Sequence, residues 1–205
     1  MNSVAIVDYG MCNLDSIARA VDECGGRPLV TDNPADLSTV NRIILPGVGA
    51  FGDAMRNLRQ RGLDRTLAEQ VIGEKIPFLG ICLGMQLIAK RGTEHGCHDG
   101  LGWIDGDVVR LERHAVTERI PHIGWNEVHC VRPSELFEGI RGDVDFYFVH
   151  SYHVVCRDAE DIVATTPYCG GFTSAVRRGH ILGVQFHPEK SQKAGFQLLR
   201  NFLAL

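Results

Sequence analysis

Residues 76–90 read IPFLGICLGMQLIAK: an apolar run, a cysteine close to two glycines, and a segment with helical character. Residues 77–81 predict a buried strand, and residues 83–90 predict a helix directly after it. A strand, a sharp turn and a helix around one nucleophilic side chain form a nucleophile elbow, here with the sulfur of Cys82 in place of a serine oxygen. The glycines let the chain turn sharply, and we expect Cys82 to be presented at the carboxyl end of its strand.

The helix expected after Cys82 points its N-terminus at the sulfur. The partial positive charge there favours a thiolate, and the free N–H groups can bind a developing oxyanion. Residues 185–190, QFHPEK, offer a base for that thiolate far along the chain. In a Cys82–His187–Glu189 triad, the imidazole accepts and returns a proton while the carboxylate fixes its tautomer. The alternative for His187 taken alone is a structural histidine.

The first half of the chain alternates strand and helix patterns. Strands are expected at residues 4–7, 27–30, 42–45 and 77–81, and helices at 14–24, 51–61 and 63–72. This order predicts an α/β fold with a parallel sheet covered on both faces and with ligands at the carboxyl ends of the strands. The second half predicts a closing helix at 195–203 and short strands at 108–111, 127–131, 146–149, 162–165, 174–176 and 181–185.

The composition is that of an ordinary globular protein and predicts one domain over residues 1–205. Hydrophobic residues make up 44% and charged residues 22%, with a net charge of −4. Without a basic block or a long apolar stretch, neither nucleic-acid binding nor a membrane span is expected, and the first residues begin a strand rather than a signal peptide. The seven cysteines are an odd number without a C-x-x-C pair, which favours a reducing, cytoplasmic location over a disulfide framework.

Two further segments carry glycine-rich or polar patterns. Residues 46–49, PGVG, end an expected strand but lack the lysine and hydroxyl residue of a phosphate loop. By itself this segment predicts an ordinary strand-to-helix turn; at the same sheet edge as Cys82 it becomes a candidate oxyanion strand. Residues 94–99, EHGCHD, match no standard zinc spacing and predict a solvated loop, so no metal site is expected.

Taken together, these motifs resemble those of the class I (triad) glutamine amidotransferases. The elbow GICLGMQ at 80–86 and HPE at 187–189 are the signature of that family. Other segments resemble one branch of it, the glutaminase subunits of imidazole glycerol phosphate synthases: DYGMCNL at 8–14, PGVGAF at 46–51, PHIGWN at 121–126, FYFVHSY at 146–152 and FHPEKS at 186–191. These segments are spread over nearly the whole chain.

The resemblance implies a flavodoxin-like α/β fold with a mostly parallel central sheet and helices on both faces. It implies hydrolysis of L-glutamine through a Cys82 thioester, without a cofactor, and transfer of ammonia to a (β/α)₈-barrel cyclase in a heterodimer of L-histidine biosynthesis. Carried over by motif, Cys82 is the nucleophile, His187 the acid/base and Glu189 its orienter. The other implied roles are an oxyanion strand of Gly47, Val48 and Gly49 with the Leu83 N–H, glutamine contacts from Gln86, Ser151 and Tyr152, and partner contacts from Asn13 and Trp125.

One departure from the branch and three alternatives accompany this interpretation. The branch usually has glycine where this chain has Cys12, in a loop that faces the partner. A paralogous glutaminase that feeds a surface-sugar amidation synthase is an alternative with the same chemistry, favoured by residues 100–106, GLGWIDG. A partner-independent cysteine hydrolase and a non-catalytic binding module are alternatives of other classes, and the intact triad argues against the second.

Overall fold

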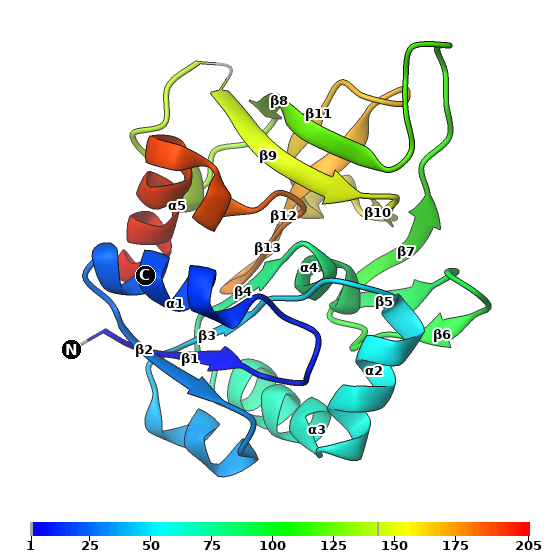
Figure 1. Cartoon of the computed structure of the whole chain (residues 1–205). Helices are drawn as coiled ribbons and strands as arrows, with labels where there is room; N and C mark the ends of the chain where they lie inside the picture. The colour runs from blue at the N-terminus through cyan, green and yellow to red at the C-terminus, as the bar shows by residue number, and fades with distance from the viewer. Residues whose placement is uncertain (1, 143) are drawn as a thin grey trace.

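The computed structural model describes residues 2–142 and 144–205, and a nine-stranded sheet runs through them (Figure 1). Its strand order is β2-β1-β3-β4-β13-β12-β11-β8-β9. The strands of its parallel half are β2 (Arg27–Thr31), β1 (Ser3–Val7), β3 (Arg42–Leu45), β4 (Phe78–Ile81) and β13 (Ile181–Val184). Antiparallel strands continue the sheet: β12 (Phe172–Arg178), β11 (Ile162–Thr166), β8 (His122–Cys130) and β9 (Val144–His150).

The α/β class predicted from the sequence is confirmed, and the sheet is mixed. Strands β4 and β13 are continuous apolar runs that are buried along their whole length, as parallel strands covered on both faces are. Strands β8 and β9 instead mix buried and exposed residues and pair antiparallel from His122 opposite His150 to Val128 opposite Val144. The parallel arrangement predicted for the first half of the chain therefore ends at β13.

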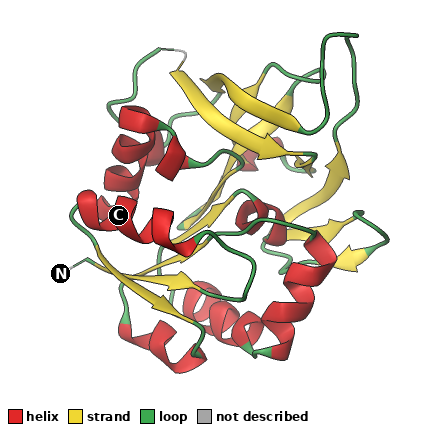
Figure 2. Ribbon diagram, in the orientation of Figure 1, coloured by secondary structure: helices red, strands yellow, loops and turns green. Residues whose placement is uncertain are grey.

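Helices cover both faces of the sheet, as expected (Figure 2). The apolar residues of α1 (Leu14–Glu23) and α5 (Gln192–Ala204) form one core with the strands, and those of α2 (Phe51–Gln60), α3 (Leu63–Ala68) and α4 (Leu83–Leu87) form the other. Because neighbouring residues of a strand point to opposite faces, Ile6 belongs to the first core and Val7 to the second. In the described ranges, each helix falls short of the length and apolar character that crossing a membrane requires.

Short helical turns complete the chain. Four are 3₁₀ turns, η1 (Pro34–Thr39), η3 (Glu135–Phe137), η4 (Ala159–Asp161) and η5 (Pro188–Lys190), and η2 (Glu69–Gly73) is a π turn. The helix predicted at 63–72 is thus divided into α3 and the π turn that follows it.

A second, four-stranded sheet was not predicted from the sequence. Its order is β10-β7-β5-β6, with β10 (Tyr152–Cys156), β7 (Ile104–Arg110), β5 (Ala89–Gly92) and β6 (His98–Asp99). The helix predicted to reach residue 90 ends at Leu87, because Ala89 pairs with Ile104 in this sheet and is fully buried there. Part of the loop predicted at 94–99 is likewise a strand, since His98 pairs with Gly92.

Candidate active site

The nucleophile elbow lies between β4 and α4, at the carboxyl end of the parallel strands (Figure 1). A Cβ atom on Gly84 would lie 1.7 Å from the Leu45 carbonyl oxygen, and one on Gly80 would lie 2.6 Å from the Gly84 carbonyl oxygen. The two glycines therefore permit close packing of α4 on the sheet, whereas the turn itself falls on Cys82. Its φ of 54° is strained for a residue with a side chain, as is typical of a nucleophile at an elbow.

The expected base lies beside the sulfur, directly after β13. Glu189 Oε1 lies 2.8 Å from His187 Nδ1, and both side chains are nearly inaccessible to solvent. Burial lowers the pKa of His187, but the hydrogen bond and charge of Cys82, joined by those of Glu189, outweigh burial and raise the pKa to about 10. The imidazole therefore holds a proton between sulfur and carboxylate over the neutral pH range.

The backbone of the His187 segment is fixed from two sides. The His187 N–H donates to the Tyr147 carbonyl of β9 over 2.9 Å, and the Ser191 hydroxyl donates to the His187 carbonyl over 2.6 Å. The same hydroxyl accepts the Tyr147 N–H at 3.0 Å. These contacts tie the imidazole to the main sheet, so its position does not depend on a free loop.

Gln185 is a site residue that sequence reasoning missed. Its side chain is fully buried, and its Nε2 donates to Cys82 Sγ at 3.7 Å. Its Oε1 accepts from Gln86 Nε2 at 3.0 Å, and the same Gln86 nitrogen donates to the Tyr152 carbonyl at 2.9 Å. The available signal was a polar residue at the end of an otherwise apolar strand, two positions before His187.

A cavity of about 330 Å³ opens above the sulfur. Cys82 lines this cavity together with most of the predicted binding residues: Val48, Gly49, Leu83, Gln86, Ser151 and Tyr152. Glu94 also lines it, although its segment was predicted to be a solvated loop. The Glu94 carboxylate is positioned by the Phe51 N–H at the start of α2, which donates to its Oε2 at 2.9 Å. The cavity therefore has a nucleophile on its floor and an acidic group on its wall.

The predicted oxyanion strand lies next to Cys82, but both expected donors are engaged by backbone carbonyls. The Val48 N–H donates to the Met11 carbonyl at 2.8 Å. The Leu83 N–H donates to the Gly47 carbonyl at 3.3 Å. Gly49, with φ of 104°, ends this segment in a conformation that suits glycine. In this state neither N–H is directed at an incoming oxyanion.

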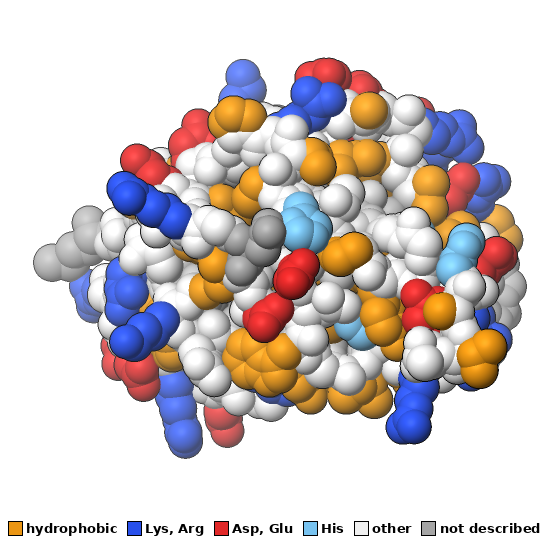
Figure 3. Space-filling model, turned by 90° about the horizontal axis from the view of Figure 1, so that it is seen from above, with side chains coloured by type: hydrophobic (Ala, Val, Ile, Leu, Met, Phe, Trp, Pro, Cys, Tyr) orange, Lys and Arg blue, Asp and Glu red, His pale blue; other side chains and the backbone are white. Residues whose placement is uncertain are grey.

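The two residues predicted to contact a partner are exposed. Asn13 precedes α1, and Trp125 on β8 is 46% exposed, with its ring 5.9 Å from that of Tyr147. Figure 3 looks onto the molecule from above, where hydrophobic side chains lie among charged ones of both signs. Cys12, in contrast, turns inward: its thiol donates to the Pro46 carbonyl at 3.4 Å, and burial raises its pKa to about 11.

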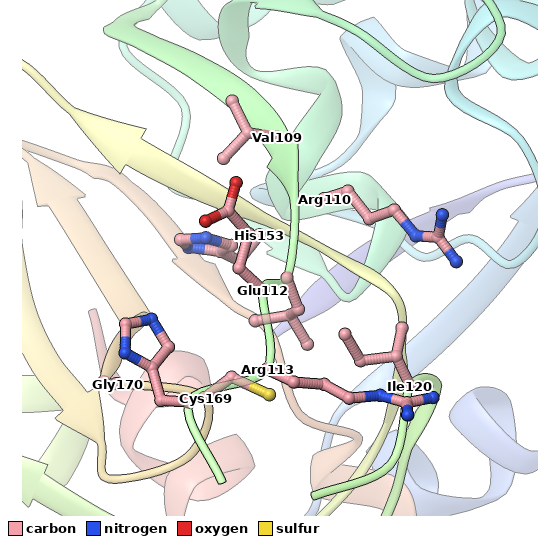
Figure 4. Close-up of a pocket in the computed structure, with 11 residues that line it drawn as sticks. Val109, Arg110, Glu112, Arg113, Ile120, His153, Cys169 and Gly170 are labelled. Carbon is pink, nitrogen blue, oxygen red and sulfur yellow. The ribbon is translucent and has the colours of Figure 1, made fainter. Parts of the chain in front are cut away.

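A larger hollow of about 750 Å³ lies elsewhere and shares no lining residue with the site cavity (Figure 4). It is bordered by Arg110, Glu112, Arg113 and His153, and the two arginine side chains extend to the same side of the view. No residue of the predicted triad lines this hollow, so its larger volume does not make it the candidate active site.

A buried histidine pair lies behind the site cavity. His122 Nδ1 and His150 Nε2 are 3.1 Å apart, and His150 Nδ1 lies 2.9 Å from the Tyr152 carbonyl. Burial lowers the pKa of His122 to about 4 and that of His150 to about 3. Both imidazoles are therefore neutral at physiological pH. A single proton on one of the two facing nitrogens lets one ring donate a hydrogen bond to the other.

This pair predicts a loss of stability in mild acid. Below pH about 6.5, a histidine in the unfolded chain binds a proton, whereas buried His122 and His150 stay neutral. The unfolded state therefore gains stability relative to the folded state, and the free energy of unfolding falls as pH drops from about 6.5 towards 4. His122→Phe, which keeps the ring stacked on Tyr168, should make this decline shallower in denaturant titrations at several pH values. Equal slopes in the wild type and His122→Phe contradict this account.

Comparisons with known proteins agree with this geometry. The family model "Glutamine amidotransferase class-I" matches residues 5–205. The chain is 45% identical over 202 residues to the imidazole glycerol phosphate synthase subunit HisH 1 of Campylobacter jejuni (strain RM1221), covering 98% of this chain and 100% of that protein. It is 47% identical over 202 residues to the subunit HisH of Moorella thermoacetica (strain ATCC 39073 / JCM 9320), covering 98% and 94%.

A solved structure shares the fold at lower identity. A chain of PurLQS from Thermotoga maritima superposes with a TM-score of 0.74 at 18% identity, over 98% of this chain and 97% of that one. The fold is thus shared widely, while the identities above 40% run over almost the full length of both proteins. The resemblance stated from the sequence motifs is confirmed: the chain belongs to the class-I glutamine amidotransferases and, within them, to the family of the imidazole glycerol phosphate synthase subunits HisH.

Proposed function

We propose that this chain is a single glutaminase domain that hydrolyses L-glutamine to glutamate and ammonia for an imidazole glycerol phosphate synthase. The ammonia passes to a (β/α)₈-barrel cyclase in a heterodimer that serves L-histidine biosynthesis. The observation that carries the proposal is the strained Cys82 beside a buried His187–Glu189 pair, in a chain 45% identical to a HisH subunit. The chemistry requires neither a metal nor a cofactor.

The proposed reaction runs in two halves at one sulfur. The Cys82 thiolate attacks the side-chain amide carbon of glutamine, and the imidazolium of His187 gives its proton to the leaving nitrogen, which departs as ammonia. The remaining acyl group is a thioester on Cys82. Neutral His187 then takes a proton from water, the hydroxide attacks the thioester, and glutamate leaves as the thiolate and imidazolium are restored.

The cavity supplies groups of the right charge for an amino acid. The Glu94 carboxylate on its wall suits the α-ammonium group of glutamine. Gln86, Ser151 and Tyr152 line the cavity beside Cys82 and are proposed to help hold the glutamine, while Gln185 contacts both Gln86 and the Cys82 sulfur. A volume of about 330 Å³ is at the lower end of the range for small-molecule sites, which fits a substrate of this size.

Activity is proposed to depend on a rearrangement of the oxyanion strand. Hydrolysis requires N–H groups at the developing oxyanion, yet those of Val48 and Leu83 are engaged with carbonyls here. A partner that binds the productive arrangement more tightly shifts the population towards it. Isolated protein should therefore be a weak glutaminase, and the cyclase with its nucleotide bound should raise the rate strongly.

Val48→Pro tests the oxyanion donor. Proline lacks the N–H and fixes φ, so the substitution should lower partner-stimulated turnover by about 10²–10³-fold. Val48→Ala keeps the N–H and is the matched control, with turnover near that of the wild type. Complex formation, measured by analytical gel filtration, should survive in both. A Val48→Pro complex that runs at the full stimulated rate, or a full rate in the isolated subunit, refutes the gated strand.

The partner is tested by co-purification and by turnover. We expect the chain to co-purify with a barrel cyclase and to be stimulated by it, with contacts from Asn13 and Trp125. If a sugar-amidation synthase stimulates turnover instead, the proposed chemistry stands, but the protein serves the paralogous pathway. Full activity that no synthase alters supports an independent hydrolase, and absence of glutamine hydrolysis in every complex supports a binding module.

A further inference from the structure

Tyr9, in the loop between β1 and α1, places an unpartnered hydroxyl under the oxyanion strand. The side chain is fully buried, and among the described residues its hydroxyl has no hydrogen-bond partner. A Cβ atom on Gly47 would lie 1.9 Å from that hydroxyl oxygen, so the oxygen rests directly against Gly47. Leaving a hydroxyl buried without a partner is unfavourable, which points to a partner in another state of the site.

The neighbouring Cys12 offers this hydroxyl only a weak contact. The Cys12 thiol donates to the Val7 and Pro46 carbonyls, at 3.7 and 3.4 Å, and its sulfur is a poor acceptor that does not give Tyr9 a hydrogen bond of normal geometry. Burial raises the pKa of Tyr9 well above its ordinary value, and the charge of Cys12 and the contact with its thiol add to the rise. The hydroxyl therefore keeps its proton and remains a donor.

The Gly47–Val48 peptide shows what a second state requires. In a trans peptide the C=O and the following N–H point in opposite directions. Here the carbonyl of Gly47 accepts from Leu83, on the site side, while the N–H of Val48 donates to Met11, on the loop side. Rotation of this one peptide unit exchanges the two directions. It frees the Leu83 N–H, turns the Val48 N–H towards Cys82, and turns the Gly47 carbonyl towards the loop that holds Tyr9.

We propose that Tyr9 is a positioning residue that stabilises the productive oxyanion strand by donating its hydroxyl to the rotated Gly47 carbonyl. This inference rests on the proposed glutaminase function. Without such a donor, the turned carbonyl would face the Met11 carbonyl, which has just lost the Val48 N–H. With it, the turned Gly47 carbonyl has a donor, and Tyr9 contributes only to the active state.

Tyr9→Phe tests the inference because it removes the hydroxyl and keeps the ring. In the complex with the cyclase and its nucleotide, we expect kcat for glutamine to fall about tenfold, the effect of one lost hydrogen bond in the active state. KM for glutamine should stay unchanged, and the thermal midpoint should not fall, because the resting state loses only an unpaired group. Tyr168→Phe is the matched control: it removes a hydroxyl that donates to the Arg119 carbonyl at 2.8 Å, far along the chain, and should leave kcat unchanged.

A double-mutant cycle shows whether Tyr9 acts through the strand. In the Val48→Pro background, where the oxyanion donor is already missing, Tyr9→Phe should change kcat by less than about twofold. A tenfold loss in both backgrounds, a fall in the thermal midpoint that matches the loss of rate, or a wild-type kcat in Tyr9→Phe each overturns the inference. The proposed function is tested separately by Cys82→Ser: if that variant is inactive while Tyr9→Phe is normal, only the role of Tyr9 fails.

Discussion

Glutamine hydrolysis should disappear in the Cys82→Ser variant, while the protein remains folded. The site is built for sulfur: Gln185 approaches Sγ at 3.7 Å, and the hydrogen bond and charge of Cys82 are leading causes of the raised pKa of His187. An alcohol in this place ionises far less readily than a thiol, so it loses the charge that the imidazolium was positioned to stabilise. We expect turnover to fall by at least about 10⁴-fold, as when a catalytic nucleophile is removed.

The measurement combines turnover with chemical labelling. An electrophilic glutamine analogue should label Cys82 alone among the seven cysteines, as shown by mass spectrometry of the digested protein. Cys97→Ser, at an exposed thiol, is the control and should keep both turnover and labelling. The Cys82→Ser complex should still produce imidazole glycerol phosphate from added ammonia, because that step lies on the partner. Labelling at another cysteine, or a wild-type rate in the serine variant, would show that Cys82 is not the nucleophile.

The elbow and the His187–Glu189 pair could be predicted from the sequence because their signals are local. A short apolar run, one cysteine and two nearby glycines specify a strand-turn-helix, and His187 and Glu189 lie two residues apart. The glycines act differently from the prediction. Gly84 is required because Leu45 lies against its Cα, whereas the positive φ falls on Cys82 itself. The pattern predicted the turn, but the contact that demands glycine lies on another strand.

Features that depend on distant pairing could not be predicted. Residues 83–90 have helical character, yet Ala89 leaves the helix because Ile104 offers it a strand partner. Glu94 was assigned to a solvated loop, since nothing in its neighbourhood reveals that its carboxylate meets the N-terminus of α2, 43 residues away in sequence. The hydrogen bond of the Val48 N–H depends on how the loop before α1, which contains Met11, packs against the oxyanion strand, and no short motif encodes that packing.

His187→Ala should lower glutamine turnover in the complex by at least about 10²–10⁴-fold, the usual contribution of a general acid/base. In the proposed reaction His187 supplies the proton for the leaving ammonia, and its raised pKa beside Cys82 keeps that proton available. Added ammonia should bypass the defect in synthesis by the partner. A His187→Ala complex that hydrolyses glutamine at the wild-type rate is incompatible with the triad.

Glu189→Gln should cost less than His187→Ala and should change the pH profile in a defined direction. Glutamine keeps the size of the side chain and can still accept from Nδ1, but it lacks the charge that helps to raise the pKa of His187 to about 10. Without that charge the imidazolium loses its proton more readily. Because ammonia leaves only if His187 is protonated, the alkaline limb of the kcat profile should move to lower pH than in the wild type. A variant that loses rate equally at every pH, with the limb unmoved, shows that Glu189 holds the ring in place without tuning its proton.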